Sequence, residues 1–204
     1  SITFLLSSLR FGGGERVALN LAHALKAKGF HVDFVLMQCD GEYLAEARQH
    51  FNVVDLECDR TWKLPFKLAV YLVNVSPYAL ISSFWKLNLC ACLARVVRPG
   101  MRLLLWEHSP PSKSVNSPIW LYAPSASLLY RLSTGVISVS NGVRDDIAEI
   151  TIGLRRKLKV IFNPIPPPLN KIDGYYINSN SKPRAKRILW VGRLDAPKNP
   201  GLML

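Results

Sequence analysis

Cysteine is scarce in this sequence, and so are acidic residues and long uninterrupted apolar segments. Four of the 204 residues are cysteine, and none forms a Cys-x-x-Cys pair or a Cys/His cluster with the spacing of zinc ligands. We therefore expect free thiols, no metal site and a cytoplasmic protein, because reducing compartments keep cysteines unpaired. A chain of this length buries enough surface to fold without disulfide or metal cross-links.

No segment has the unbroken apolar length of a transmembrane helix. The longest stretch without a charged residue runs from Leu68 to Trp85, and it includes Asn74, Pro77 and three serines. Such a segment spans a bilayer poorly, and a turn at residues 74–77 divides it into a helix and a strand. The composition, 49% apolar and 20% charged, is that of a globular domain and excludes collagen, coiled coils and wholesale disorder.

The shortage of acidic residues gives the chain a net charge of +12. Residues 1–60 carry six Lys/Arg and eight Asp/Glu, whereas residues 61–204 carry twenty and six. The second part should therefore attract anions, which include phosphates, acidic lipid headgroups and nucleic acids. A basic surface that is merely solvated is the alternative.

Apolar strand patterns alternate with helical patterns along the first 162 residues. Strands are predicted at residues 2–7, 31–37, 52–56, 78–82, 102–107, 135–140 and 159–162. Helices are predicted at residues 15–28, 43–50, 65–75, 87–97, 119–132 and 142–150, the last with Asn141 as its N-cap. This alternation predicts the α/β class, with a doubly wound, Rossmann-like parallel sheet and helices on both faces.

A change in composition after Asn163 indicates a domain boundary. Four prolines lie between residues 164 and 168, and the polar segment 177–186 has a basic end. We predict an N-terminal domain over residues 1–164 and a linker over residues 165–186. Residues 187–204 are then the truncated start of a second domain, with one strand and the beginning of a helix.

A glycine-rich turn, Phe11-Gly12-Gly13-Gly14-Glu15-Arg16, joins the first predicted strand to the first predicted helix. Glycines let a ligand approach the backbone closely, and the free N–H groups of a helix N-terminus suit a phosphate. The turn matches neither G-x-G-x-x-G nor the Walker pattern, which weakens the case for a dinucleotide or an ordinary NTP site. A tight turn without a ligand is the alternative.

Two more polar turns follow predicted strands, and ligands in open α/β sheets bind at the carboxyl ends of the strands. His108 comes directly after Glu107, and its imidazole can hydrogen-bond or polarise a reacting hydroxyl. The alternative is a histidine at a strand end whose hydrogen bonds are made within the protein and which contacts no ligand. Ser140 and Arg144 belong to the second turn, where helix capping is the alternative to ligand contact.

Two cations lie in the loop that follows the strand at residues 187–192. Arg193 offers a planar fork for phosphate oxygens, and Lys198 offers a point charge. The pair therefore suits a diphosphate, and a solvated turn is the alternative.

Five segments in this order resemble family 4 of the retaining glycosyltransferases, which have the GT-B architecture. They are Gly13-Gly14-Glu15-Arg16, Glu107-His108, Val139-Ser140-Asn141-Gly142-Val143, Val160-Ile161-Phe162-Asn163-Pro164, and Val191-Gly192-Arg193-Leu194 with Lys198-Asn199-Pro200. The resemblance covers nearly the whole chain. It implies two Rossmann-like domains facing a cleft, of which this chain contains the N-terminal, mainly acceptor-binding one.

The same resemblance implies a role for each residue and a reaction. His108 would be catalytic, at the reacting sugar and the acceptor hydroxyl. The donor diphosphate would contact Gly13, Gly14, Arg193 and Lys198. The cleft or acceptor side would be lined by Glu107, Ser140, Arg144 and Asn163. The enzyme would move a hexosyl or N-acetylhexosaminyl group from a nucleotide-diphosphate sugar to a glycan or lipid-linked acceptor in cell-surface polysaccharide synthesis, with retention and without a cofactor or metal.

Two aromatic segments, residues 62–67 and 119–122, interleave large apolar groups with cations or expose an apolar patch, as interfacial segments do. We expect a peripheral contact with the anionic inner face of the membrane, and ordinary helix core is the alternative.

A basic nucleic-acid or polyanion binding module is the alternative function. No RRM, KH, helix-turn-helix or zinc-finger pattern supports it, so no nucleic acid is expected. A Rossmann enzyme such as a nucleotide-sugar epimerase ranks lower, because the dinucleotide fingerprint and a Tyr-x-x-x-Lys pair are missing.

The paired glutamates of the resembled family belong to its second domain, and they would lie beyond residue 204. We therefore expect this chain alone to be catalytically inert. Incubation with nucleotide sugars and acceptors should yield no glycosylated product, and measurable turnover by the isolated chain would contradict this expectation.

Overall fold

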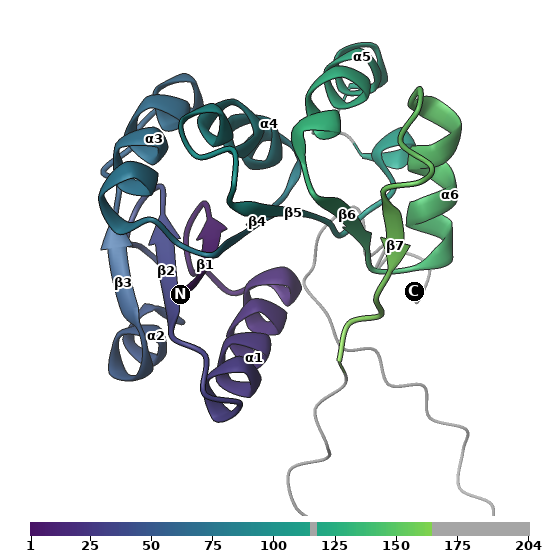
Figure 1. The fold of residues 1–204 in the computed structure, drawn as a ribbon. Coiled ribbons are helices and arrows are strands. Elements are labelled where there is room, and N and C mark those ends of the chain that lie inside the picture. Colours follow the sequence, from purple (N-terminus) through teal and green to yellow (C-terminus); the bar gives the residue numbers. More distant parts are fainter. Residues whose placement is uncertain (115–117, 165–204) are drawn as a thin grey trace, which may run out of the picture. The chain divides into compact units, whose positions relative to one another are not determined.

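The structure is a computed structural model, and it describes residues 1–114 and 118–164 (Figure 1). Its strands are β1 (Ile2–Leu6), β2 (Val32–Leu36), β3 (Asn52–Asp55), β4 (Ala79–Ser83), β5 (Arg102–Glu107), β6 (Gly135–Ser138) and β7 (Leu158–Val160). Its α-helices are α1 (Gly13–Ala27), α2 (Leu44–His50), α3 (Leu64–Val75), α4 (Trp85–Ala94), α5 (Ile119–Leu129) and α6 (Asn141–Ile150). Short 3-10 helices are η1 (Thr61–Lys63), η2 (Arg95–Val97), η3 (Pro111–Lys113) and η4 (Tyr130–Leu132).

The strands form one parallel sheet in the order β3-β2-β1-β4-β5-β6-β7. At its centre, Ile2 of β1 lies opposite Val32 of β2 on one side and opposite Ala79 of β4 on the other. The chain first extends the sheet outward to β3 and then returns to build the other half from β4. The direction of winding therefore reverses between β1 and β4, and the predicted doubly wound, Rossmann-like sheet is confirmed.

Helices cover both faces of the sheet, and each face has its own apolar core. α1 and α2 pack on one face, where the rings of Phe4 and Phe34 stack with centroids 5.3 Å apart. α3, α4, α5 and α6 pack on the other face, over a core that includes Leu5, Leu80 and Leu105. Figure 1 shows α1 and the α3–α5 layer on opposite sides of the strands. Consecutive residues of a central strand therefore enter different cores.

The break predicted within the long apolar stretch is present. α3 ends at Val75, Ser76 takes a left-handed conformation with φ of 51°, and β4 begins at Ala79. Among the residues that the structure describes, no helix combines the length and apolar character needed to cross a bilayer.

Several predicted boundaries differ from the structure. The N-cap of α6 is Ser140 and not Asn141, because the Ser140 hydroxyl accepts a hydrogen bond from the N–H of Val143 at 3.2 Å. α4 begins earlier than predicted, and α4 and α5 both tighten into 3-10 turns before the predicted helix ends. The predicted linker and second domain, residues 165–204, lie outside the described residues.

The four cysteines are free, as predicted, and three of them are buried. Burial raises the pKa of Cys90 to about 11 and that of Cys92 to about 12. Both thiols therefore stay protonated near neutral pH and pack as small apolar side chains. Within residues 1–114 and 118–164, no three His, Cys, Asp or Glu side chains are grouped so that they could hold a metal ion.

The turn after β1 is fixed against the turn after β2. The N–H of Leu9 donates to the carbonyl of Asp40 at 2.8 Å, and the N–H of Tyr43 donates to the carbonyl of Leu9 at 2.9 Å. Gly41 lies between these contacts with φ of 114°, and a Cβ at this position would lie 2.1 Å from the carbonyl carbon of Leu9. The approach of the two turns, which sets the course of the chain into α1, therefore requires glycine at position 41.

The substitution Gly41→Ala should lower the free energy of unfolding by on the order of 2–3 kcal/mol, because the backbone is strained and the backbone of Leu9 blocks the new methyl group. Gly100→Ala is the matched control, since its Cβ would meet nothing within 4 Å. Urea unfolding of both variants measures the difference. Equal losses for the two variants would contradict the assignment.

Candidate functional site

The predicted site residues that the structure describes gather at the carboxyl edge of the sheet. Gly13 and Gly14 follow β1, Glu107 ends β5 and His108 comes next, Ser140 and Arg144 follow β6, and Asn163 follows β7. In a parallel sheet these strand ends share one edge, and ligands bind where the winding reverses, here between β1 and β4. Arg193 and Lys198 lie outside the described residues.

His108 packs against two aromatic rings and the first turn of α1. Its ring centroid lies 5.1 Å from that of Phe84 and 4.6 Å from that of Trp106. On the α1 side, a Cβ on Gly14 would lie 3.5 Å from Cε1 and 3.6 Å from Nδ1 of His108. We call Gly14, Phe84, Trp106 and His108 the His108 cluster.

The two glycines at the start of α1 have different surroundings. A Cβ on Gly14 would lie 3.1 Å from Cζ of Phe84, which is closer than ordinary van der Waals contact. A Cβ on Gly13 would meet nothing within 4 Å. Gly14 therefore allows the helix to approach the two rings, whereas the space beside Gly13 is open to a ligand.

Phe84 holds an uncommon backbone conformation, with φ of 72° and ψ of 140°. Its N–H donates to the carbonyl of Trp106 at 3.2 Å, which fixes the residue between the end of β4 and the start of α4. Bulky residues rarely adopt positive φ, and such strain persists mainly at functional sites, where the surroundings enforce it.

Burial lowers the pKa of His108 to about 4, so its imidazole is neutral near pH 7. Its Nε2 is buried without a hydrogen-bond partner among the described residues. The same holds for Oγ of Ser83 and Nε1 of Trp106, which lie opposite each other in the register of β4 and β5. Buried polar atoms without partners are uncommon, and three of the seven among the described residues belong to the His108 cluster or to Ser83 beside it, which favours a site for polar ligands.

The N-terminus of α1 is not capped by a side chain of its N-cap residue, Gly12. A Cβ on Gly12 would lie 2.0 Å from Oε2 of Glu15, so this carboxylate lies over the first turn. A phosphate at the helix terminus would have to share it with Glu15 or displace that side chain. Arg16 is not directed to the site, since it forms an ion pair with Glu46 at 2.9 Å and joins α1 to α2.

Glu107 enters the opposite core from His108, because successive side chains of a strand alternate. Its side chain is 4% exposed, and its Oε1 accepts hydrogen bonds from Asn88 at 3.1 Å, from Tyr122 at 3.4 Å and from Tyr130. Burial raises the pKa of Glu107 to about 7, against the opposing effect of these donors. This position favours a role in anchoring the end of β5 to α4, α5 and η4. Its expected role in lining the cleft stays a prediction.

The remaining predicted residues lie near the edge without joining the His108 cluster in any described contact. The Ser140 hydroxyl is used as the N-cap of α6. The guanidinium of Arg144 is half-exposed and pairs with Asp145 at 2.8 Å. Asn163 is exposed after β7. Their roles as cleft-lining residues stay predictions.

The loop that leaves His108 is tied to α6 by a contact that the sequence did not indicate. The backbone N–H of Ser112 donates to Oδ2 of Asp146 at 3.0 Å, and the Ser112 hydroxyl donates to Oδ1. Phe84 and Tyr130 also went unpredicted, since neither aromatic belongs to a recognisable motif. Asn88 does carry a signal, because it is the one amide within an apolar helix, and such a residue must find a buried partner.

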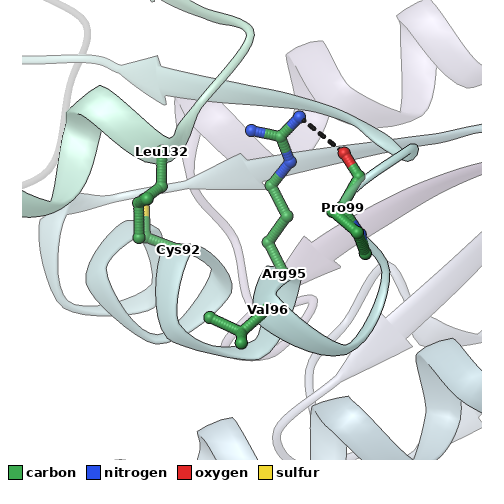
Figure 2. A pocket seen from close by; sticks show the side chains of 5 residues that line it. All are labelled: Cys92, Arg95, Val96, Pro99 and Leu132. Atoms are coloured by element: carbon green, nitrogen blue, oxygen red, sulfur yellow. Dashed lines mark hydrogen bonds between the residues drawn. The ribbon is translucent and has the colours of Figure 1, made fainter.

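A small cavity of about 130 Å³ lies at the opposite, amino-terminal edge of the sheet (Figure 2). Arg95 is its charged residue, but the guanidinium donates to the carbonyls of Pro99 at 3.1 Å and Met101 at 3.2 Å. These bonds fix the turn that leads into β5. The cavity therefore belongs to the structural support of this turn, and it is remote from the His108 cluster.

Residues 11–168 match the protein family described as Glycosyltransferase Family 4. The chain belongs to this family. It contains the N-terminal Rossmann-like domain of the family's GT-B architecture, as the sequence resemblance predicted.

One curated relative of this family 4 domain comes from Campylobacter jejuni. It is the GalNAc-alpha-(1->4)-GalNAc-alpha-(1->3)-diNAcBac-PP-undecaprenol alpha-1,4-N-acetyl-D-galactosaminyltransferase, 24% identical over 212 residues. The match covers 100% of this chain and 55% of that protein. The chain thus spans about half the length of the curated relative that it matches.

Solved structures share the fold. HepE of Anabaena, in complex with UDP and glucose, matches with a TM-score of 0.63 and 18% identity over 80% of this chain and 44% of that one. The UDP-GlcNAc 2-epimerase of Methanocaldococcus jannaschii matches with a TM-score of 0.54 and 12% identity over 79% and 45%. The fold alone therefore does not separate transferases from epimerases, whereas the family match does.

The buried carboxyl of Glu107 should make stability depend on pH. Because the pKa of Glu107 is raised from 4.5 to about 7, the native state keeps a proton that the unfolded chain releases, and the free energy of unfolding falls as pH rises through that window. The effect should amount to roughly 3 kcal/mol between about pH 4.5 and pH 7.

Urea unfolding across this pH range should show that Glu107→Gln removes most of the decline, because glutamine does not titrate. Glu149→Gln, on the exposed side of α6, should leave the wild-type profile unchanged. If Glu107→Gln and the wild type show parallel profiles, the buried carboxyl does not govern the decline.

Proposed function

We propose that this domain is the acceptor-side half of a retaining glycosyltransferase. The enzyme moves a hexosyl or N-acetylhexosaminyl group from a nucleotide-diphosphate sugar to a glycan or lipid-linked acceptor, in the synthesis of cell-surface polysaccharide. The observation that carries the proposal is the packing of a neutral His108 against the first turn of α1 where the sheet changes direction. No cofactor is needed for this chemistry.

In the proposed reaction the acceptor oxygen forms a bond to the anomeric carbon, and the bond from that carbon to the donor phosphate breaks. The acceptor proton passes to the leaving diphosphate, which takes up the bonding electrons. This chain therefore supplies positioning and charge stabilisation, and it supplies no nucleophile.

His108 and Gly13 each have a defined part in this proposal. The neutral imidazole of His108 holds a hydroxyl of the reacting sugar by a hydrogen bond. The open side of Gly13 and the first-turn N–H groups of α1 accept the diphosphate, whose charge the helix dipole favours. Arg193 and Lys198 would neutralise the leaving group from the next domain. Glu107, Ser140, Arg144 and Asn163 stay candidates for the acceptor side.

The named relatives support the class of substrates. HepE has been solved with UDP and glucose, and the Campylobacter jejuni relative is named for an acceptor linked to undecaprenol through diphosphate. A lipid-linked acceptor would bring the enzyme to the cytoplasmic face of a membrane. Nucleic acid is not among the proposed partners. Retarded migration of the intact enzyme with unrelated DNA at physiological salt would revive the alternative of a polyanion-binding module.

The substitution His108→Ala in the intact enzyme should reduce kcat/KM by about a hundredfold or more, because the reacting sugar loses a positioned hydrogen-bond partner. His50→Ala, an exposed histidine on α2, is the matched control and should retain wild-type activity. The measurement is transfer of radiolabelled sugar from a panel of nucleotide sugars to lipid-linked acceptors in detergent. Equal activity of both variants, or no transfer by the wild type from any donor, would overturn the proposal.

A further inference from the structure

The outer sides of α3, α4 and α5 are apolar, although these helices cover the sheet from solvent. Large side chains project outward on α3 at helical spacing, with Phe66 71% and Val70 62% exposed. Leu93 is exposed on α4, and on α5 Trp120 is 77% and Leu128 69% exposed. We call the outward side chains of α3, α4 and α5, with those of η1 and η2, the α3–α5 face.

A helix that is apolar on every side is normally buried on every side. α6 gives the contrast within the same sheet, because its exposed residues include Asp145 and Glu149. α3 and α4 are neighbours, and α4 and α5 are neighbours, so their apolar outer sides adjoin (Figure 1). Exposed apolar surface that extends over adjoining helices marks an interaction site.

The charge of this face is predominantly positive. Between Arg60 and Arg144 the sequence contains a single acidic residue, Glu107, which is buried on the inner side of the helices. Six Lys/Arg lie between Arg60 and Glu107. Lys86 on α4 and Arg102 at the start of β5 are exposed. One exposed carboxylate borders the face, because Asp59 directly before η1 pairs with Lys63 at 2.8 Å. Apart from this pair, the face offers large apolar groups and cations.

We propose that the α3–α5 face docks on an anionic lipid membrane, with the apolar side chains in the headgroup region and the cations against lipid phosphates. Apolar burial and attraction between Lys/Arg and acidic headgroups act together in such contacts. A second copy of the chain fits this face poorly, because the docking of two identical faces would bring like charges together. The proposal concerns the partner of this surface, and its relevance to catalysis rests on the proposed function.

The position of the face relative to the His108 cluster suits a lipid-linked acceptor. In a parallel sheet each helix begins at the carboxyl edge, so Trp62 before α3 and Ile119 at the start of α5 lie toward that edge. α5 is the next α-helix after His108 in the chain, and it contributes Trp120 and Leu128 to the α3–α5 face. An acceptor anchored in the membrane would thus present its diphosphate and sugar at the edge that carries His108.

Vesicle co-sedimentation of the intact enzyme tests the proposal. Wild-type protein should bind vesicles rich in phosphatidylglycerol, bind pure phosphatidylcholine vesicles at least tenfold more weakly, and dissociate as salt rises. Failure to bind anionic vesicles at low salt would overturn the proposal. Equal binding to both lipids would overturn its electrostatic part.

Three variants locate the contact, and one serves as a control. Phe66→Ser with Val70→Ser, and Trp120→Ser with Leu128→Ser, should each reduce the bound fraction at least tenfold, because each pair removes two side chains from the apolar contact. Lys86→Glu should reduce binding to anionic vesicles alone. Phe30→Ser, 48% exposed after α1 on the other side of the sheet, should bind like wild type.

These substitutions are at exposed positions, and thermal melting should confirm that each variant folds. Wild-type binding by both double variants would overturn the proposal, as would dimerisation of the wild type that the same substitutions abolish. Transfer to a detergent-solubilised acceptor should be unchanged in the α3–α5 variants. Vesicle binding without any transfer would contradict the proposed function alone, and transfer without vesicle binding would contradict this inference alone.

Discussion

The close packing of the first turn of α1 on the ring of His108 is the constraint on which the arrangement of the site depends. The packing is close enough that a Cβ at position 14 would lie 3.1 Å from the ring of Phe84, a residue whose backbone has positive φ. It also leaves the imidazole desolvated and neutral, while the adjoining Gly13 stays open. A neutral hydrogen-bond partner beside a helix N-terminus suits a sugar attached to a diphosphate better than it suits acid–base chemistry.

The two proposed roles of this domain lie on different faces of the sheet. His108 enters the α1 side at the end of β5, whereas Glu107 enters the other core and is bonded to side chains of α4, α5 and η4. Two of the helices that secure this strand end, α4 and α5, also contribute their outer sides to the apolar, basic α3–α5 face. The proposed substrate site and the proposed membrane contact would thus be connected through the end of β5, although they share no residue.

The sequence predicts most of the fold because each strand of a buried parallel sheet is a short apolar run and each crossover helix shows its own spacing. It also predicts the edge that carries the site, since Gly14 and His108 both follow strands. Successive side chains along β5 point to opposite faces of the sheet, so the sequence could have placed Glu107 and His108 on different faces. The family resemblance, however, treats the two residues as one motif. No residue pattern predicts the positive φ of Phe84, because tertiary contacts impose it on an unfavourable residue.

Histidine resonances of the intact, 13C-histidine-labelled enzyme test the central claim most directly. The Cε1 signal of His108, assigned by its loss in His108→Gln, should shift when a nucleotide-diphosphate sugar is added and should not titrate between about pH 5 and pH 8. A signal that ignores saturating donor, or that titrates with an ordinary histidine pKa, would contradict the account of a buried, neutral, sugar-contacting imidazole.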